Sequence, residues 1–245
     1  MSEYQFPTHR LATALEDESR TPLILVACGS FSPITYLHLR IFEMARDHIQ
    51  DLGKFELIAG YFSPVSDKYQ KEGLAKSEHR VNMCRMAVDS TSNWLMVDDW
   101  EASQPTYQRS VLVLDHFDKE INQVRGGVVT KSGIHKKVKI MLLAGGDLIE
   151  SFGIPGLWDP FDLNRILGEY GTVVVERTGV DVYGFLLAND SIYQHRKNVI
   201  VVKQLIHNDI SSTKIRLFVK RGMSIKYLLP NQVIDYINKH DLYKQ

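Results

Sequence analysis

A glycine, a serine and a histidine near the N-terminus stand at a spacing that could bind phosphate. Residues 23–28 form an apolar run typical of a buried parallel strand, and apolar side chains at helical spacing follow Thr35. A tight turn from a strand into a helix directs free backbone N–H groups and the positive end of the helix dipole at one point. Gly29 lets a ligand approach the main chain, and Ser30 adds a hydroxyl. Thr35 as N-cap would place His38 in the first helical turn, although the spacing alone fits an ordinary strand, turn and helix equally well.

A second segment, residues 208–216, could supply another helix start with phosphate-binding residues. Ser211 or Ser212 can cap this helix, and Thr213 and Arg216 share a face because they are three residues apart. A capped basic helix on the surface would show the same pattern. Two helix starts, one with a histidine and one with serine, threonine and arginine, form a more specific pair than either alone.

The elements that must position these residues alternate along the chain. Further strands are predicted at residues 55–62, 94–97, 139–144, 172–176 and 198–202, and helices at 77–88, with Ser77 as its cap, and at 105–124. Such alternation predicts right-handed βαβ units and an α/β fold of Rossmann-like type, doubly wound, with a mainly parallel sheet and helices on both faces. In such folds ligands bind beyond the carboxyl ends of the strands.

The chain is predicted to hold one domain, residues 23–245, after a flexible N-terminal leader, residues 1–22. Residues 125–137 contain three glycines and three lysines with little apolar content, which predicts a mobile surface loop. The lysines at the end of this loop could form a nuclear localisation signal, but a solvated loop explains them as well.

Composition narrows the class of protein. The 245 residues are 44% hydrophobic and 24% charged, with a formal net charge of +0, so no overall field attracts nucleic acid or a membrane and any anion site must be local. The two cysteines predict free thiols in a reducing compartment. Without a membrane-length apolar run or a signal-peptide pattern, an intracellular place in the nucleus, the cytoplasm or both is expected.

Several motifs in one order resemble a known family. GSFSPITYLH, residues 29–38, resembles the first signature of the nucleotidylyltransferase superfamily in its eukaryotic version, and ISSTKIR, residues 210–216, resembles the second. SPVSDKYQK at 63–71, AGGDL at 144–148 and PGLW at 155–158 fit between them. From about residue 23 to residue 243 the chain resembles the nicotinamide/nicotinate mononucleotide adenylyltransferases. The resemblance implies an enzyme of NAD biosynthesis that joins ATP and nicotinamide or nicotinate mononucleotide into NAD or deamido-NAD plus pyrophosphate, by in-line attack of the mononucleotide phosphate on the α-phosphate.

The resemblance also implies the site residues, with His38 and Arg216 as the catalytic pair. For ATP it implies Gly29, Ser30, Phe31, His38, Gly145, Asp147, Asn208, Ser211, Thr213 and Arg216. For the mononucleotide it implies Ser30, Phe31, Lys71, Tyr107, Ser110, Leu157 and Trp158. Mg²⁺ would be held mainly by phosphates and water, with no metal ligands from the protein. Without the resemblance, purely structural roles would explain three of these positions. Trp158 could belong to the core, Lys71 could be a solvated surface residue, and Asp147 could cap a helix.

Departures from the family pattern leave alternatives open. Thr35 and Leu37 replace a histidine and a glycine of the wider signature, and Ser32 replaces an asparagine. Another transferase of the superfamily, with pantetheine phosphate or a cytidylyl donor, fits less well because Lys71 and Trp158 match the mononucleotide branch. A non-catalytic nucleotide-binding or chaperone-like protein on the same scaffold is the alternative from another class. The resemblance implies a homo-oligomer, whereas the preference between the two mononucleotides stays open.

Overall fold

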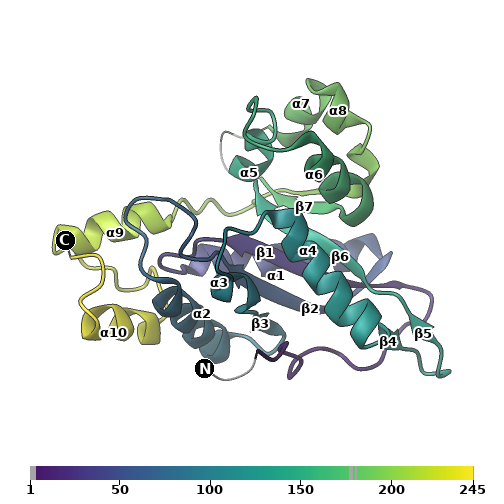
Figure 1. The fold of residues 1–245 in the computed structure, drawn as a ribbon, viewed down its shortest axis with the longest axis horizontal. Helices are drawn as coiled ribbons and strands as arrows, with labels where there is room; N and C mark the ends of the chain where they lie inside the picture. The colour runs from purple at the N-terminus through teal and green to yellow at the C-terminus, as the bar shows by residue number, and fades with distance from the viewer. Residues whose placement is uncertain (1–3, 177–178, 180, 245) are drawn as a thin grey trace.

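The computed structural model describes residues 4–176, 179 and 181–244, and a six-stranded parallel sheet lies at its centre (Figure 1). The strand order is β3-β2-β1-β6-β7-β8, so the order reverses between β1 and β6. The strands are β1 (Thr21–Gly29), β2 (Phe55–Pro64), β3 (Leu95–Val97), β6 (Lys139–Gly145), β7 (Thr172–Val175) and β8 (Val199–Val202). This doubly wound α/β arrangement confirms the predicted fold class.

Helices cover both faces of the sheet. Helices α1 (Tyr36–Leu52), α2 (Ser77–Thr91), α9 (Ser212–Lys220) and α10 (Asn231–Lys239) contribute to one apolar core. The other core draws on α4 (Ser110–Asp118), α5 (Gly146–Ser151), α7 (Val182–Leu187), α8 (Asp190–Tyr193), and the π-helical turns η1 (Lys119–Val124) and η2 (Arg165–Tyr170). The remaining short pieces are α3 (Trp100–Ser103), α6 (Pro160–Asn164) and the 3₁₀ turn η3 (Arg196–Asn198).

The alternation of β1 explains why the two cores are separate. Leu23 and Leu25 point to the first core, whereas Ile24 and Val26 point to the second, because successive side chains of a strand lie on opposite faces. All four are fully buried. A strand buried on both faces reads as a continuous apolar run, which is the pattern that predicted it.

Two helix starts differ from the sequence prediction. The helix predicted over 105–124 begins only at Ser110, and its N-cap Arg109 is extended, with φ −72° and ψ 146°. The helix over 77–88 begins at Ser77 as predicted, but Ser77 is its first residue and not its cap. The Ser77 hydroxyl donates instead to the Asp67 carboxylate.

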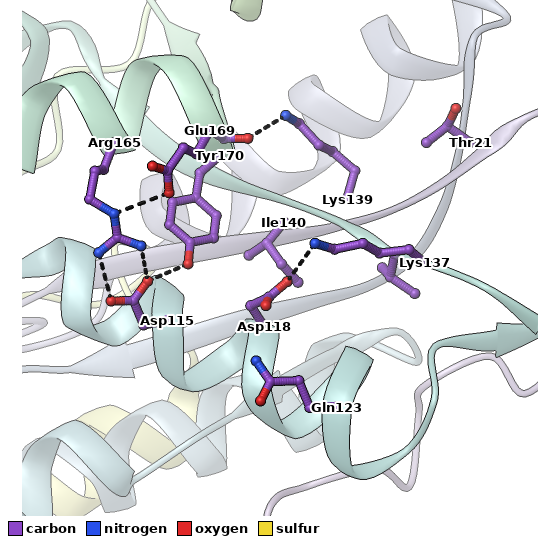
Figure 2. Close-up of a pocket in the computed structure, with 11 residues that line it drawn as sticks. Thr21, Asp115, Asp118, Gln123, Lys137, Lys139, Ile140, Arg165, Glu169 and Tyr170 are labelled. Carbon is purple, nitrogen blue, oxygen red and sulfur yellow. Dashed lines mark hydrogen bonds and ion pairs between the residues drawn. The ribbon is translucent and has the colours of Figure 1, made fainter.

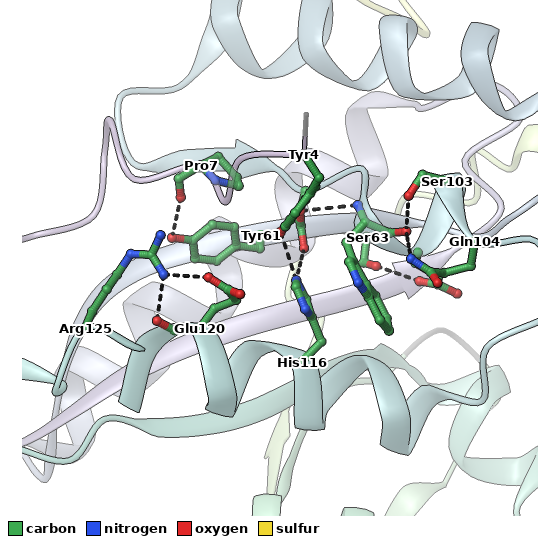
Figure 3. Close-up of polar contacts among 12 residues, drawn as sticks. Tyr4, Pro7, Tyr61, Ser63, Ser103, Gln104, His116, Glu120 and Arg125 are labelled. Atoms are coloured by element: carbon green, nitrogen blue, oxygen red, sulfur yellow. Dashed lines mark hydrogen bonds and ion pairs between the residues drawn. The ribbon is translucent and has the colours of Figure 1, made fainter. Parts of the chain in front are cut away.

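The N-terminal segment, residues 4–20, packs on the second face of the sheet. Phe6 and Leu15 are buried in that core. The Tyr4 hydroxyl donates to Asp98 Oδ1 at 2.8 Å and lies 2.9 Å from His116 Nε2 (Figure 3). The predicted boundary at residue 22 therefore does not coincide with a change in packing, and β1 begins at residue 21. Apolar residues are too sparse in this segment for a periodic pattern, so its burial depends on the rest of the fold. Its flexibility stays a prediction.

The predicted mobile loop, residues 125–137, forms a small antiparallel hairpin. Its strands are β4 (Val128–Val129) and β5 (His135–Lys136), and Val128 is buried. Ser132 near its tip contacts the Glu18 carboxylate through its N–H and its hydroxyl. The mobility of the hairpin stays a prediction.

Two further features bear on the sequence analysis. Both cysteines, Cys28 and Cys84, are free thiols. In the part of the chain that the structure describes, every helix is too short or too polar to cross a membrane.

Candidate active site

A cavity of about 730 Å³ opens at the carboxyl ends of β1 and β6, where the strand order reverses. This is the place at which open parallel sheets bind ligands. Most of the residues predicted for the site line it: Ser30, His38, Lys71, Tyr107, Ser110, Gly145, Asp147, Leu157, Trp158, Ser211, Thr213 and Arg216. The fold thus brings together segments that are far apart in the sequence.

His38 is fixed at the start of α1 by a capping box. Thr35 is the N-cap, as predicted, and the backbone N–H of Thr35 donates to His38 Nδ1 at 2.9 Å. A backbone N–H can only donate, so Nδ1 accepts and the proton of the neutral imidazole lies on Nε2. The cap therefore orients the ring and makes Nε2 a hydrogen-bond donor on a side chain that lines the cavity.

Gly29 and Phe31 shape the turn and do not line the cavity. Phe31 has φ 44°, and its buried ring packs edge-on against His38, with centroids 5.3 Å apart. A Cβ at Gly29 would lie 2.9 Å from the Phe31 ring, so glycine leaves the space that the ring needs. Both residues shape the turn, and the ATP contacts expected from their main chain stay a prediction.

The second helix start is tied to the first turn. Ser211 caps α9 by accepting from Lys214 N–H, and the hydroxyl of Ser212 donates to Pro33 O at 2.8 Å. Arg216 Nη1 donates to Ser32 O at 2.8 Å, and Nη2 donates to Thr213 Oγ1 at 3.3 Å. Two positive helix ends therefore face one region of the cavity.

A buried arginine that the sequence analysis missed joins the turn to the loop that carries Lys71. The Arg80 side chain is 0% exposed. Its guanidinium donates to the carbonyl oxygens of Ser30, Val65 and Ala75 at 2.7–3.0 Å. The sequence could not predict this role of Arg80, because its three carbonyl partners lie outside its own helix.

Aromatic side chains also line the cavity. Trp158 donates through Nε1 to Ser151 Oγ at 3.0 Å and packs edge-on against Phe152. Tyr107 stacks on Tyr69, with centroids 5.6 Å apart and planes 26° apart. Tyr69 lines the cavity too, although the sequence analysis did not select it. These rings offer flat apolar surface to a ring of a ligand.

Charged residues that line the cavity were also missed. Arg109 Nη1 lies 2.7 Å from Asp162 Oδ2, and both residues line the cavity with Asp159. Arg109 is half-exposed, whereas the Asp162 side chain is 5% exposed. The pair joins the segment of Tyr107 and Ser110 to the segment of Trp158.

Two predicted ATP residues have surroundings that the sequence did not indicate. Asp147 lies in the first turn of α5, whose N-cap is Gly145, so the capping role considered for Asp147 is wrong. Asn208 lies outside the lining of the cavity, and its side-chain oxygen accepts from Ile210 N–H at 3.0 Å. A contact of Asn208 with adenine stays a prediction.

A buried carboxyl lies behind the site. Glu101, in α3, is 2% exposed and accepts from the Ser63 hydroxyl at 2.6 Å. Burial raises the pKa of Glu101 to about 8, although the hydrogen bond from Ser63 and the charge of Arg80 lower it. Ser63 is near the end of β2, so this contact holds α3 against the sheet.

A second hollow, at the amino ends of β1 and β6, is built from mutually paired charges (Figure 2). Arg165 forms two hydrogen bonds with the Asp115 carboxylate, to which Tyr170 also donates. Lys139 donates to Glu169 O, and Lys137 lies 3.7 Å from Asp118. These contacts tie α4 to η2 and β6, and the hollow lies at the end of the sheet where ligands are not expected.

The donor set of the main cavity fits a metal ion that enters with a phosphate ligand. Within the described residues, no group of three His, Cys, Asp or Glu side chains could hold a metal ion. Mg²⁺ usually keeps several waters and binds through one or two carboxylates together with substrate phosphates. Asp147 lines the cavity and can serve in that way.

Comparisons with known proteins agree with this geometry. The family model described as cytidylyltransferase-like matches residues 26–218. The chain is 61% identical over 243 residues to nicotinamide/nicotinic acid mononucleotide adenylyltransferase 1 of Saccharomyces cerevisiae, which covers 99% of this chain and 61% of that protein. It is 39% identical over 257 residues to the Bos taurus protein named nicotinamide/nicotinic acid mononucleotide adenylyltransferase 1, covering 94% of this chain and 91% of the relative.

The solved nicotinic acid mononucleotide adenylyltransferase of Plasmodium falciparum has the same fold. Its TM-score is 0.61 at 21% identity, covering 90% of this chain and 96% of that one. The chain spans 61–66% of the length of three yeast relatives. Matches over most of the chain nevertheless settle its family: it belongs to the cytidylyltransferase-like family and, within it, to the nicotinamide/nicotinic acid mononucleotide adenylyltransferases.

Proposed function

We propose that the protein is an adenylyltransferase that joins ATP and nicotinamide or nicotinate mononucleotide into a dinucleotide and releases pyrophosphate. The observation that carries the proposal is one cavity that is lined both by the starts of two helices and by aromatic side chains. The helix starts suit the phosphates of ATP, and the aromatic side chains suit a pyridine ring. The family membership supports the same pair of substrates.

The two helix starts supply donors and positive charge without a covalent intermediate. The N-termini of α1 and α9, His38 Nε2 and the Arg216 guanidinium would receive the triphosphate, with Ser211 and Thr213 beside them. Preorganised donors of this kind stabilise the charge that develops on the transferring and leaving phosphate oxygens. His38 and Arg216 are therefore the proposed catalytic residues.

The mononucleotide would lie across the rest of the cavity. Trp158 and Tyr107 would flank the pyridine ring, Ser110 and Leu157 would contact the same end, and Lys71 would contact the 5′-phosphate. The Arg80 contacts support this assignment because they tie the loop of Lys71 to the turn at Ser30.

The reaction needs no general base. An oxygen of the mononucleotide 5′-phosphate attacks the α-phosphorus of ATP, a new P–O bond forms, and the P–O bond to the β-phosphate breaks as pyrophosphate leaves. A phosphate monoester has a second pKa of about 6, so the attacking oxygen is already deprotonated at neutral pH. His38 accordingly acts as a donor to phosphate and not as a base.

A divalent cation belongs to the proposal as a companion of ATP. Adenylyltransferases of this family generally use a divalent metal, and we infer Mg²⁺ here. Phosphate oxygens and water would hold it, and Asp147, which lines the cavity, could offer one further oxygen. When bound, it would neutralise part of the triphosphate charge.

The deciding experiment mixes the purified protein with ATP, Mg²⁺ and each mononucleotide in separate reactions. Formation of a dinucleotide together with pyrophosphate supports the proposal, and the ratio of the two rates gives the preference between nicotinamide and nicotinate. Binding of ATP without release of pyrophosphate in the presence of either mononucleotide would instead favour the non-catalytic or chaperone-like alternative.

Self-association and cellular place remain proposals. We infer a homo-oligomer from the family resemblance, and the mass in solution measured by light scattering checks it. A place in the nucleus or the cytoplasm is supported by the two free thiols, which suit a reducing compartment.

A further inference from the structure

Ser32, in the turn between β1 and α1, is contacted by three other segments of the chain. Its hydroxyl accepts from Ala75 N–H at 3.0 Å and lies 2.9 Å from the hydroxyl of Tyr243. Its carbonyl oxygen accepts from Arg216 Nη1 at 2.8 Å. Ser32 is 0% exposed. Ser32, a buried residue of the β1–α1 turn, is therefore the point at which the loop of Lys71, helix α9 and the C-terminal segment meet.

Tyr243 reaches this turn through an uncommon backbone conformation. It follows α10 and has φ 65°, in the left-handed region that side chains other than glycine rarely adopt. Such a conformation is unfavourable and persists where surrounding contacts determine it. The contact with Ser32, which lies 211 residues away along the chain, is one of these surrounding contacts.

The phenol is neutral beside two arginines. Burial raises the pKa of Tyr243 to about 12, although the hydrogen bond with Ser32 and the charges of Arg216 and Arg80 lower it. A neutral hydroxyl can fix Ser32 without adding a negative charge that would offset the charge of Arg216. Tyr243 itself does not line the cavity, whereas Arg216 does.

We propose that Tyr243 is a positioning residue for the ATP phosphates. Its hydroxyl holds Ser32, and through Ser32 it fixes the β1–α1 turn and the Arg216 side chain in the arrangement that receives the triphosphate. The identity of this ligand rests on the proposed function. The role differs from simple anchoring of the C-terminus because it acts through a hydrogen bond to the turn.

Tyr236 offers a matched control within the same part of the chain. Its hydroxyl, on α10, bonds with His79 Nδ1 at 3.0 Å and accepts from Asn82 at 3.3 Å, away from the turn. Tyr236→Phe and Tyr243→Phe each remove one partly buried hydroxyl from the C-terminal region. Only Tyr243→Phe removes a contact with Ser32.

The experiment measures the ATP dissociation constant by calorimetry, without mononucleotide, at a temperature where thermal unfolding shows each variant to be folded. Loss of one hydrogen bond predicts binding weaker by about three- to tenfold in Tyr243→Phe and unchanged in Tyr236→Phe. In a Ser32→Ala background, Tyr243→Phe should cause no further loss, because residues that act through one contact are not additive. Ser32→Ala alone approaches the same contact from the other side, should Tyr243→Phe not fold.

The results distinguish a failure of the role of Tyr243 from a failure of the proposed function. Unchanged ATP binding in Tyr243→Phe, equal losses in both tyrosine variants, or additive losses in the double variant would each overturn the positioning role. With Ser32→Ala as the only folded variant, unchanged ATP binding would overturn the positioning role, because this variant lacks the contact with Tyr243 as well as the bond from Ala75 N–H. If the wild-type chain binds ATP but releases no pyrophosphate with either mononucleotide, the proposed function fails while the dissociation constants still decide the role of Tyr243.

Discussion

At the scale of single residues, the capping box of α1 gives His38 two roles that can be separated. The Nδ1 atom stabilises the helix start by accepting from Thr35 N–H, and this contact leaves the proton on Nε2. Glutamine at the same position of a helix also completes a capping box. Substitution by glutamine can therefore keep the structural role while it removes the imidazole.

We expect His38→Ala to lower kcat by about two to three orders of magnitude, as the loss of one preorganised donor does. It should also lower the free energy of unfolding by about 1 kcal/mol through loss of the cap. His38→Gln should lose a similar factor in kcat with near wild-type stability. Pyrophosphate release and urea unfolding measure the two effects. Normal turnover in either variant would contradict the catalytic role.

The aromatic side chains of the cavity lead to a prediction for the second substrate. Trp158→Ala should raise the KM for the mononucleotide by about ten- to a hundredfold, because a stacked ring and its buried area are lost. The KM for ATP should stay near its wild-type value. Trp158→Phe keeps an aromatic face and should retain most of the affinity. Initial rates with each substrate varied in turn measure both constants, and a change confined to the KM for ATP would show that the assignment is wrong.

At the scale of elements, the contact between α3 and β2 should respond to pH. Glu101 has an ordinary pKa of 4.5 in the unfolded chain and a pKa of about 8 when buried. The folded state therefore binds this proton more tightly. Its contribution to the free energy of unfolding is fully present below pH 4.5 and is lost as the pH rises through about 8.

Glu101→Gln carries no titrating proton and should flatten this dependence. Urea unfolding at about pH 5 and about pH 8 should show a smaller loss of stability in Glu101→Gln than in the wild type. Because the Ser63 hydroxyl can donate to the amide oxygen, the variant should fold at both values. Identical pH dependence in the two proteins would mean that Glu101 is already ionised in the folded state.

The elements also show what a sequence can and cannot predict. Buried parallel strands are continuous apolar runs, so all six were found, with ends displaced by up to two residues. The start of α4 was predicted at Pro105, five residues too early, and the short α3 was not predicted. Family motifs predicted half of the residues that line the cavity. Arg80 and Arg109 were missed because their partners lie on other segments.

At the scale of the whole molecule, the N-terminal segment is part of the second core. Phe6 packs against Tyr61, His116 and Phe117, with ring centroids 5.3–6.0 Å apart. The Arg125 guanidinium lies over the same ring, 4.8 Å from its centroid. The segment thus joins β2, α4 and the start of the β4–β5 hairpin. These elements lie far from it along the chain, so no local sequence pattern could predict the contacts.

We expect Phe6→Ala to lower the free energy of unfolding by about 3–5 kcal/mol, the cost of truncating a buried phenylalanine. Phe161→Ala is the matched control, because Phe161 is 69% exposed and should change stability by less than about 0.5 kcal/mol. Neither residue lines the cavity, so both variants should keep wild-type KM values at temperatures where they are folded. Urea unfolding monitored by fluorescence measures the difference. Equal stability of the two variants would mean that Phe6 is not packed in the second core in solution, as a flexible segment before β1 would require.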